Sequence, residues 1–303
     1  MPQFFIGVDA GGTKTELLGV AGEASDHRTG PGVNLSRDGL GQSTAVLVGL
    51  IADALDAHAE RPDGLCIGVA GAGREADREA LAARLHEHLG ARLGGPLHVV
   101  HDGVIALEGA LGDGSGMMAI VGTGSLVLVR TDEGEVARAG GWGAPIGDPG
   151  SGTALGRAVF AAVAADFDGG EPTMLRHLIA ERHGIETAHD LIAASSARDW
   201  QPQAFAPLAI EAATDHDWTS TRILKTEANA LAQRAGWLAT QTQPAVTPRV
   251  ALVGGLTNEA YYRECVAEAF LRHLPRWRIV RPAERPVMGA VAIAQRVAAS
   301  DAR

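Results

Sequence analysis

The feature of this chain that most constrains its fold is a series of short apolar runs, each of which ends at a glycine-rich or aspartate-containing turn. The runs are "FFIGVD", "LCIGVAGAG", "LHVVHDG", "MMAIVGTGS" and "RVALVGGLTN". Apolar runs of this length that stop at turn residues are typical of buried strands. Between them lie segments such as "READREALAARLHEHLG", whose apolar residues recur three and four positions apart, as in amphipathic helices. The pattern predicts an α/β protein, in which ligands bind at the carboxyl edge of the sheet.

The order of these elements repeats along the chain. Residues 4–20 and 117–130 each read as a strand, a glycine turn and a second strand. Residues 65–89 and 250–271 each read as a strand, a glycine-rich loop and a helix. Two copies of one plan indicate two similar domains that face each other across a cleft.

Two segments stand outside this repeat. Residues 153–240 have an almost wholly helical pattern and read as an insertion into the second copy. The segment "TQTQPAVTP", residues 240–248, has the composition of a linker. We therefore expect the second domain to contain the extra helices and to continue after this linker.

The composition of the chain limits which kinds of partner it can bind. With 303 residues, 46% of them hydrophobic, the chain can bury the cores of two domains. Its formal net charge of −10 argues against a surface for nucleic acid or an anionic membrane. Its two cysteines support neither a disulfide framework nor a Cys-rich zinc site. Because we find no export signal and no apolar run near the roughly 18 residues of a membrane helix, we expect a cytoplasmic protein with small-molecule or protein partners.

The first glycine turn, in "IGVDAGGTKTELLGV", offers groups that suit a phosphate. It is not a Walker A loop, because Thr13 precedes Lys14 and Val8 occupies the earlier glycine position. Glycines in such a turn let backbone N–H groups approach phosphate oxygens. Asp9, beside the turn, could hold a hydrated Mg²⁺. An ordinary β-turn with a solvated aspartate is the alternative.

Two further glycine turns extend this pattern. The turn Gly122-Thr123-Gly124-Ser125 offers the same donors from the second domain, and a phosphate chain gripped between two such turns is the interpretation that we favour. The third turn, Gly254-Gly255, lies between a strand and a helix and suits the close approach of a flat or bulky group. Tight packing of the strand on the helix is its alternative explanation.

Asp102 in "LHVVHDGVIALEGAL" is the candidate general base. It follows a buried strand and precedes a helix, so its carboxylate should be exposed at the edge of the sheet. A base that takes a proton from an attacking hydroxyl during phosphoryl transfer needs such a rigid position. The alternative is a helix N-cap, a role that aspartate often takes. We expect the neighbouring His101 to point away from the site.

The segment "GGWGAPIGDPGSGTALG", residues 140–156, is too rich in glycine and proline for a plain linker. It reads as the wall of a binding site, in which Asp148 is presented to the hydroxyl groups of a ligand. The alternative is a structural loop that ends with Ser151 as the N-cap of the following helix.

Taken in order, these stretches resemble one known family over nearly the whole chain. The matching stretches are "GVDAGGTKT", "HDG", "IVGTGS", "GGWGAPIGDPGSG", "ALVGGL" and "MGAVAIA". They resemble the BadF/BadG/BcrA/BcrD ATPase family, within the fold of actin, heat-shock chaperones and sugar kinases. The resemblance implies two ribonuclease-H-like domains: residues 1–112, joined by a C-terminal helix at 286–303, and residues 113–285 with the helical insertion.

The resemblance also implies an activity and its site. It implies a homodimeric kinase that uses ATP and Mg²⁺ to phosphorylate the 6-hydroxyl of an amino sugar, N-acetylglucosamine. In this family's pattern Asp102 is the catalytic base, and Asp9 binds Mg²⁺ through water. The nucleotide-binding positions are Asp9, Gly11, Gly12, Thr13, Lys14, Thr15, Gly122, Thr123, Gly254 and Gly255. The sugar-binding positions are Asn34, Thr123, Gly124, Ser125, Gly141, Trp142 and Asp148.

Some positions depart from the family's pattern, and they bear on the substrate. His101 and Gly103 flank Asp102 where the family more often has Asn or Thr and Ala, and Pro149 stands where the kinases usually carry Glu. Glucosamine is the second candidate substrate. Two other classes are an activator ATPase of 2-hydroxyacyl-CoA dehydratases, which needs cysteines for an iron–sulfur cluster, and a sugar sensor without catalysis. Zinc-containing sugar kinases are disfavoured because the chain has no cysteine cluster.

Overall fold

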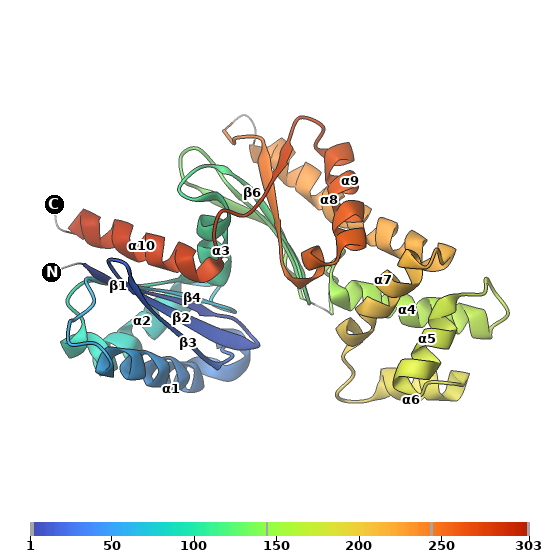
Figure 1. The fold of residues 1–303 in the computed structure, drawn as a ribbon, viewed down its shortest axis with the longest axis horizontal. Helices are drawn as coiled ribbons and strands as arrows, with labels where there is room; N and C mark the ends of the chain where they lie inside the picture. Colours follow the sequence, from blue (N-terminus) through green and yellow to red (C-terminus); the bar gives the residue numbers. More distant parts are fainter. Residues whose placement is uncertain (1–2, 144, 243–244, 302–303) are drawn as a thin grey trace. The chain divides into compact units, whose positions relative to one another are not determined.

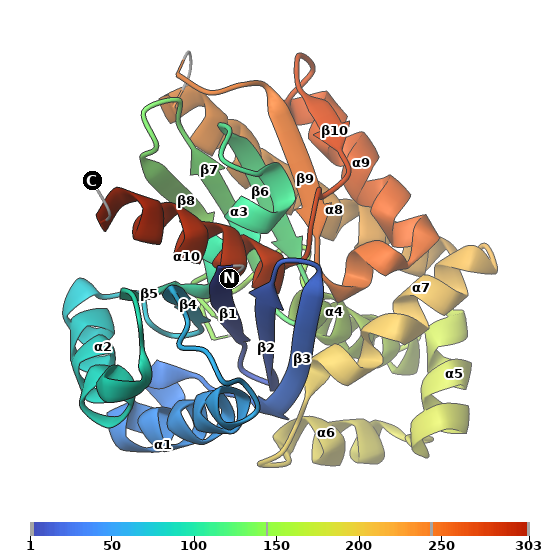
Figure 2. The same cartoon turned by 60° about the vertical axis from the view of Figure 1, so that its left-hand side comes forward.

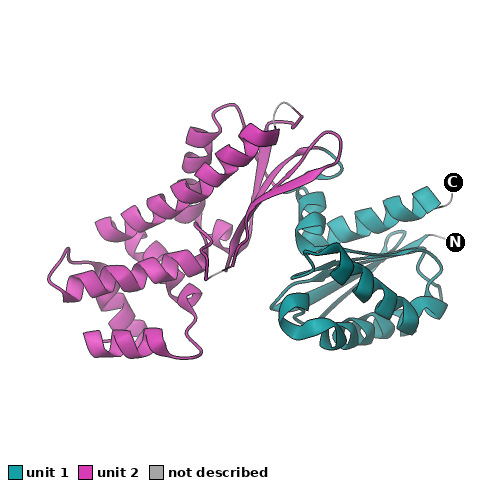
Figure 3. Cartoon of the chain, turned by 180° about the vertical axis from the view of Figure 1, so that it is seen from behind, with its two compact units in different colours: residues 1–114, 282–303 teal, residues 115–281 magenta. Residues whose placement is uncertain are grey.

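The computed structural model describes residues 3–143, 145–242 and 245–301. The chain forms two compact units, which Figure 3 shows in different colours. Unit 1 comprises residues 1–114 and 282–303, and unit 2 comprises residues 115–281. Each unit contains one five-stranded mixed sheet with helices, so the predicted α/β class is confirmed. Because the chain enters unit 1 twice, its last helix folds with its first strands.

Unit 1 contains the first five strands in the order β3-β2-β1-β4-β5. Strands β1, β4 and β5 run parallel, whereas β2 and β3 run antiparallel to their neighbours. The carboxyl ends of the three parallel strands therefore meet at one edge of the sheet. The elements are β1 (Phe4–Ala10), β2 (Lys14–Ala21), β3 (Ala24–Pro31), α1 (Leu35–Asp56), β4 (Gly64–Val69), α2 (Glu75–Leu89), η1 (Gly90–Arg92), β5 (Leu97–His101), α3 (Asp102–Leu111) and α10 (Pro286–Asp301).

Helices cover both faces of this sheet, as Figure 2 shows, with α1 and α2 on one face and α3 and α10 on the other. The small residues of "MGAVAIA", which lies in α10, let this helix pack closely on β1 and α3. A Cβ at Gly7 of β1 would lie 2.6 Å from the carbonyl oxygen of Val287, and one at Gly289 would overlap the carbonyl of Ile105 in α3. Glycine is required at both positions because the backbones themselves are in contact.

Unit 2 contains the other strands in the order β10-β9-β6-β7-β8, with β6 parallel to β9 and antiparallel to β7. Its architecture can be followed in Figure 1. The elements are β6 (Gly116–Val121), β7 (Ser125–Arg130), β8 (Val136–Gly140), α4 (Gly152–Phe167), α5 (Met174–His183), α6 (Ala188–Ser196), η2 (Pro202–Phe205), α7 (Ala206–Thr214), α8 (Trp218–Thr242), β9 (Arg249–Val253), η3 (Gly255–Asn258), α9 (Ala260–His273) and β10 (Arg278–Val280).

The predicted helical insertion is present as α4 to α8. The predicted linker at 240–248 is partly wrong, because α8 continues to Thr242, and residues 243–244 lie outside the described part of the chain. Helix α8 extends this far because Leu238 and Ala239 still pack in the core of the unit. Among the helices of the described residues, none is long and apolar enough to cross a membrane.

Candidate active site

The carboxyl edge of unit 1 brings Asp9 next to a tight glycine turn. Asp9 is the last but one residue of β1, where it pairs with Glu16 of β2 and Gly68 of β4. The N–H of Gly11 donates to the carbonyl of Lys14 at 3.1 Å and closes the turn between β1 and β2. Strand, tight turn and second strand are therefore confirmed for this stretch.

The carboxylate of Asp9 is electrostatically strained. Burial raises its pKa to about 6, with further contributions from the charges of Asp102 and Glu16, while Lys14 opposes the change. A cation near Asp9 would relieve this strain. Within the described residues, no cluster of three or more His, Cys, Asp or Glu side chains could hold a metal. The single carboxylate of Asp9 beside the turn fits an ion that takes one or two protein carboxylates and completes its shell with phosphate oxygens and water, as Mg²⁺ does.

The exposed and the buried members of this turn have different roles. Thr13 and Lys14 are exposed, and the Nζ of Lys14 lies 3.4 Å from Glu16 Oε2. Thr15 is fully buried, and its hydroxyl donates to the carbonyl of Pro31 at 2.7 Å. The hydroxyl of Thr15 is thus used to pair β2 with β3.

Asp102 is the first residue of α3, directly after β5. Its Oδ1 accepts the N–H of Gly103 at 2.8 Å and lies 2.9 Å from His101 Nδ1. His101 is the N-cap of α3, since its Nδ1 can also accept the N–H of Gly103, at 3.0 Å. The expectation that His101 points away is wrong: its ring folds back over the start of the helix and contacts the candidate base.

Asn34 lies at the start of α1, beside the end of β4. Its Oδ1 caps the helix by accepting the N–H of Arg37 at 3.1 Å. A Cβ at Gly71, where φ is +75°, would overlap this oxygen, so the loop after β4 needs glycine there. The amide nitrogen of Asn34 is the part of the side chain that the cap does not use.

Arg37 also lies at the first glycine turn, although no sequence motif pointed to it. Its Nη1 donates to the carbonyl of Gly12 at 3.1 Å, so a guanidinium lies on the phosphate-sized turn. Asp38 orients it, with Oδ1 at 2.6 Å from Arg37 Nε, and the hydrogen bond to Asp38 raises the pKa of Arg37. Its place three residues after Asn34 was the only sequence signal, and helix geometry alone does not reveal that it reaches the turn.

In unit 2 three glycine-rich segments meet at the end of β6. The N–H of Gly122 donates to the carbonyl of Gly124 at 3.0 Å, and the N–H of Gly152 donates to the carbonyl of Gly122 at 2.8 Å. Gly254 has φ +109°, and a Cβ there would lie 2.5 Å from the carbonyl oxygen of Val121. The turn at 122–125, the start of α4 and the turn at 254–255 therefore lie together at the end of β6.

The loop between β8 and α4 is anchored on the second glycine turn. The N–H of Gly141 donates to the carbonyl of Ser125 at 3.0 Å, and the Ser125 hydroxyl donates to the carbonyl of Pro149 at 2.7 Å. Ser151 is the N-cap of α4 and accepts the N–H of Ala154 at 3.1 Å. The capping role that we considered as an alternative is thus present, and it leaves the side chain of Asp148 available for another role.

Asp148 is only 7% exposed and lies against the second glycine turn. Its Oδ1 accepts the N–H of Gly143 at 3.2 Å, and a Cβ at Gly124 would lie 2.8 Å from its Oδ2. Asp148 also borders a cavity of about 390 Å³ that Glu227, among others, lines. Its carboxylate therefore lies close to the Gly122–Ser125 turn, which is where a ligand bound to that turn would meet it.

Trp142 lies in the same loop, with its side chain largely in solvent. It is 58% exposed, and the guanidinium of Arg138 lies 5.4 Å from the centre of its ring. An exposed indole with a cation on one face offers its other face to a sugar ring or another flat group.

A second cavity, of about 320 Å³, borders Gly255 in the third glycine turn. Ile210 and Leu256 provide apolar walls, and Asp215 and Glu259 provide carboxylate oxygens. Apolar walls with a few polar groups suit a purine ring and a ribose. No sequence motif marks the α7 residues, because they come together with Gly255 only through the packing of α7 near α9.

These features define an α/β protein of the actin-like ATPase and sugar kinase fold. Each sheet has a glycine turn at its edge, and carboxylates lie beside the turn in unit 1 and beside the loop in unit 2. The chain belongs to the BadF/BadG/BcrA/BcrD ATPase family, which it matches over residues 6–294. The resemblance that the sequence motifs indicated is confirmed.

Two curated relatives match along nearly the whole chain. An N-acetyl-D-glucosamine kinase of Dictyostelium discoideum is 28% identical over 313 residues, covering 96% of this chain and 98% of the relative. An N-acetylmuramic acid/N-acetylglucosamine kinase of Clostridium acetobutylicum is 30% identical over 311 residues, covering 97% and 98%.

Solved structures show the same fold. A Chromobacterium violaceum protein that is provisionally assigned as an N-acetylglucosamine kinase has a TM-score of 0.76 and 25% identity, covering 97% of this chain and 99% of that one. A ROK family glucokinase of Streptomyces griseus, solved with glucose and AMPPNP, has a TM-score of 0.58 and 19% identity over 97% and 99% of the two chains.

Proposed function

We propose that this chain is an ATP-dependent kinase that phosphorylates N-acetylglucosamine at the 6-hydroxyl. The observation that carries the proposal is the position of Asp102, a carboxylate fixed between β5 and α3 and close enough to Asp9 to raise that residue's pKa. A general base for phosphoryl transfer to a hydroxyl needs this rigid exposed position. The full-length similarity to two kinases that are named for N-acetylglucosamine supports the same activity.

In the proposed reaction Asp102 orients the 6-hydroxyl and accepts its proton. The sugar oxygen forms a bond to the γ-phosphorus of ATP as the bond to the bridging oxygen of ADP breaks. The N–H groups of Gly12 and Thr123 would donate to phosphate oxygens, with Thr13 and Lys14 completing the first turn. Gly11 and Gly122, whose N–H groups close the two turns, would let the phosphates approach the backbone because they carry no side chain. Fixed donors of this kind stabilise the charge that develops during transfer.

Asp9 would hold the magnesium ion through water molecules. Bound there, Mg²⁺ would neutralise phosphate charge. Asp9 must be ionised for this role, against the burial and the charges of Asp102 and Glu16 that raise its pKa to about 6. Arg37, on the carbonyl of Gly12, would add a second positive charge beside the turn.

Unit 2 would supply most of the sugar contacts. Asp148 would accept hydrogen bonds from sugar hydroxyls, and Gly141 and Trp142 would form the wall, with backbone groups of Gly124 and Ser125 at its edge. Unit 1 would add the amide of Asn34. A closed site around the sugar would keep out water, which could otherwise accept the phosphoryl group.

The adenosine moiety would bind at Gly254 and Gly255. The cavity beside Gly255 has the apolar walls and carboxylates that this moiety needs. We also propose that residues 1–112 with the C-terminal helix at 286–303 form one domain and residues 113–285 the other. The resemblance to the family further suggests a homodimer that works in the cytoplasm.

Among the alternatives, glucosamine is the closer one, since it differs by a single acetyl group. An activator ATPase would need accessible cysteine thiolates. Cys66 is fully buried and Cys265 is 7% exposed, and burial raises the pKa of both thiols, that of Cys66 to about 12. The sugar sensor is disfavoured because both phosphate turns and Asp102 are present.

A coupled assay of ADP release would test the proposal. The purified protein is offered ATP, Mg²⁺ and, one at a time, N-acetylglucosamine, glucosamine, N-acetylmuramic acid, glucose and N-acetylmannosamine. We expect the highest kcat/KM with N-acetylglucosamine and a product phosphorylated at the 6-position. ADP release that does not depend on any sugar would replace the kinase assignment with an ATPase.

A further inference from the structure

The loop from Gly141 to Ser151 has little intrinsic stiffness. Four of its glycines, Gly141, Gly143, Gly147 and Gly150, have positive φ. Glycine gains these conformations at a high entropic cost on ordering, so a loop of this composition is held in one shape only by contacts with other elements. The position of Asp148 within the loop depends on those contacts.

The peptide groups around Gly150 are held from two helices. The N–H of Gly150 donates to Glu227 Oε2 of α8 at 2.9 Å. The carbonyl of Gly150 accepts the hydroxyl of Tyr262 of α9 at 2.8 Å. A Cβ at Gly150 would lie 3.0 Å from Leu231 of α8, so this part of the loop packs directly on the helix.

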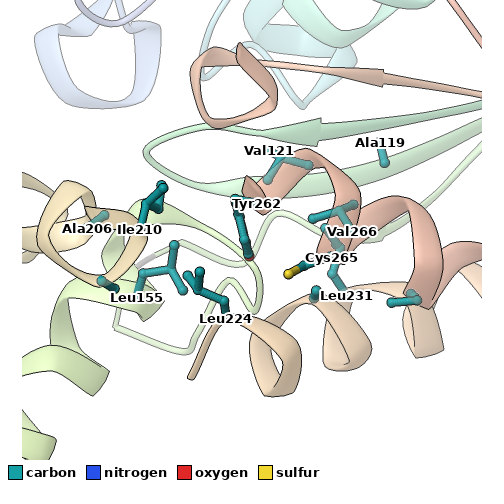
Figure 4. Packing of buried hydrophobic residues seen from close by; sticks show 14 of the residues in the cluster. Ala119, Val121, Leu155, Ala206, Ile210, Leu224, Leu231, Tyr262, Cys265 and Val266 are labelled. Carbon is teal, nitrogen blue, oxygen red and sulfur yellow. The ribbon is translucent and has the colours of Figure 1, made fainter. Parts of the chain in front are cut away.

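Tyr262 is a core residue whose hydroxyl makes a hydrogen bond to the loop. It is fully buried, and Figure 4 shows it pointing from α9 into the middle of the apolar cluster. Burial, together with the charge of Glu227, raises the pKa of Tyr262 well above its usual value, so the hydroxyl remains a hydrogen-bond donor. A buried hydroxyl that donates to a loop carbonyl fixes that loop, because breaking the bond leaves two buried polar groups without partners.

We propose that Glu227 and Tyr262 are positioning residues for the sugar-binding loop: by clamping Gly150 from α8 and α9, they set the place of Asp148. This inference rests on the proposed function, in which Asp148 contacts the sugar. Neither Glu227 nor Tyr262 is among the residues that we propose to bind ATP or to take part in the reaction. We therefore expect the clamp to act on sugar affinity more than on ATP affinity.

The kinetic test compares Tyr262→Phe with Tyr261→Phe. The first removes the hydroxyl of the clamp and keeps the ring, and the second removes a neighbouring hydroxyl of α9 that lies 3.3 Å from Thr221. We expect Tyr262→Phe to raise the KM for the amino sugar about five- to fiftyfold, because it strands the buried carbonyl. The KM for ATP should stay within twofold, and Tyr261→Phe should leave both constants unchanged. Equal losses for sugar and ATP, or no change in a folded protein, would overturn the clamp.

Variants of Glu227 test the second contact of the clamp, the hydrogen bond from the N–H of Gly150. This test does not depend on whether Tyr262→Phe folds. Glu227→Gln keeps an oxygen acceptor for the N–H of Gly150 and should restore a sugar KM within about threefold of the wild type. Glu227→Ala removes the acceptor and should raise the sugar KM as Tyr262→Phe does. If Gln and Ala behave alike, the carboxylate has no positioning role.

Amide hydrogen exchange separates a failed clamp from a failed kinase assignment. The amide of Gly150 should exchange at least tenfold faster in Glu227→Ala and in Tyr262→Phe than in Tyr261→Phe, whether or not the protein phosphorylates any sugar. Unchanged exchange at residues 147–152 would refute the clamp. A wild-type protein that shows no sugar-dependent ADP release would refute the function alone.

Discussion

The carboxylate of Glu16 lies 2.6 Å from the guanidinium of Arg285, which joins the second strand of the chain to the residue just before α10. His27 approaches the same oxygen at 2.9 Å, and Lys14 lies 3.4 Å from the other. Burial acts to raise the pKa of Glu16, but the hydrogen bonds from His27 and Lys14 and the charge of Arg285 outweigh it and lower the pKa. The C-terminal helix is thus fixed electrostatically beside the first glycine turn.

Replacing Arg285 tests this connection. Arg285→Ala should lower the free energy of unfolding at pH 7 by about 1–2 kcal/mol. We expect less than the largest values for charged hydrogen bonds because the side chain of Arg285 is 61% exposed and solvent screens the pair. Since the folded pKa of Glu16 is lowered, this stabilisation is present above its ordinary value of 4.5 and is lost as the pH falls through the folded pKa. Urea denaturation at pH 7 and pH 3 measures both, with Arg281→Ala as the control. A loss that is equal at both pH values would contradict the ion pair.

The ionised carboxylate of Asp9 should lower the stability of the folded protein. Its pKa is raised from 3.8 to about 6, so folding favours the protonated form. The stability from this group is present below pH about 3.8 and is lost as the pH rises through about 6. The free energy of unfolding of Asp9→Asn should therefore be about 1–3 kcal/mol higher than that of the wild type at pH 8, so the variant is the more stable protein there. Near pH 4 the two should be alike. Its kinase activity should be lost.

Denaturation of Asp9→Asn and the wild type between pH 4 and pH 8 measures this effect, and Asp53→Asn at an exposed position of α1 is the surface control. A variant that gains no stability at pH 8 would mean that Asp9 is not buried as described.

Asp102→Asn tests the general base. The substitution keeps the size and the oxygen that accepts the N–H of Gly103, but removes the proton acceptor. General-base contributions are typically ~10²–10⁴, so kcat should fall by on the order of 10² or more while sugar affinity stays within a fewfold. Steady-state kinetics and sugar binding by calorimetry provide the measurements, with Asp53→Asn on α1 as the control. Turnover near the wild-type rate would leave Asp102 with only its structural role at the start of α3.

Asp148→Ala separates a sugar site from a nucleotide site. Hydrogen bonds to a charged group contribute roughly 1.5–3 kcal/mol, and each ~1.4 kcal/mol is tenfold in affinity. Sugar affinity should fall about ten- to a hundredfold, while ATP binding measured without sugar barely changes. Asp199→Ala on an exposed loop is the control. Lost ATP affinity with an intact sugar KM would mean that the loop from 140 to 152 serves the nucleotide.

Iron analysis addresses the activator class. Because both cysteines are buried and their thiols have raised pKa values, we expect protein purified without oxygen to be colourless and to contain no stoichiometric iron. Metal analysis and an absorption spectrum are sufficient. A stoichiometric cluster would move the protein to the activators of 2-hydroxyacyl-CoA dehydratases.

The sequence by itself determined the features that depend on local patterns. Apolar runs that end at glycine predict β1, β4, β6 and β9, and periodic apolar residues predict α2 and α9, because strand and helix repeats are written in neighbouring residues. The place of Asp102 between a strand and a helix follows from the same patterns.

Only the tertiary structure decided the contacts between distant segments. It committed the Thr15 hydroxyl to Pro31, brought Arg37 to the first glycine turn and placed Tyr262 against Gly150. None of these leaves a periodic signal, because each depends on the direction of one side chain and on the packing of elements that lie far apart in the chain. Local sequence specifies which elements form, whereas the close packing of those elements selects the partner that each buried polar group finds.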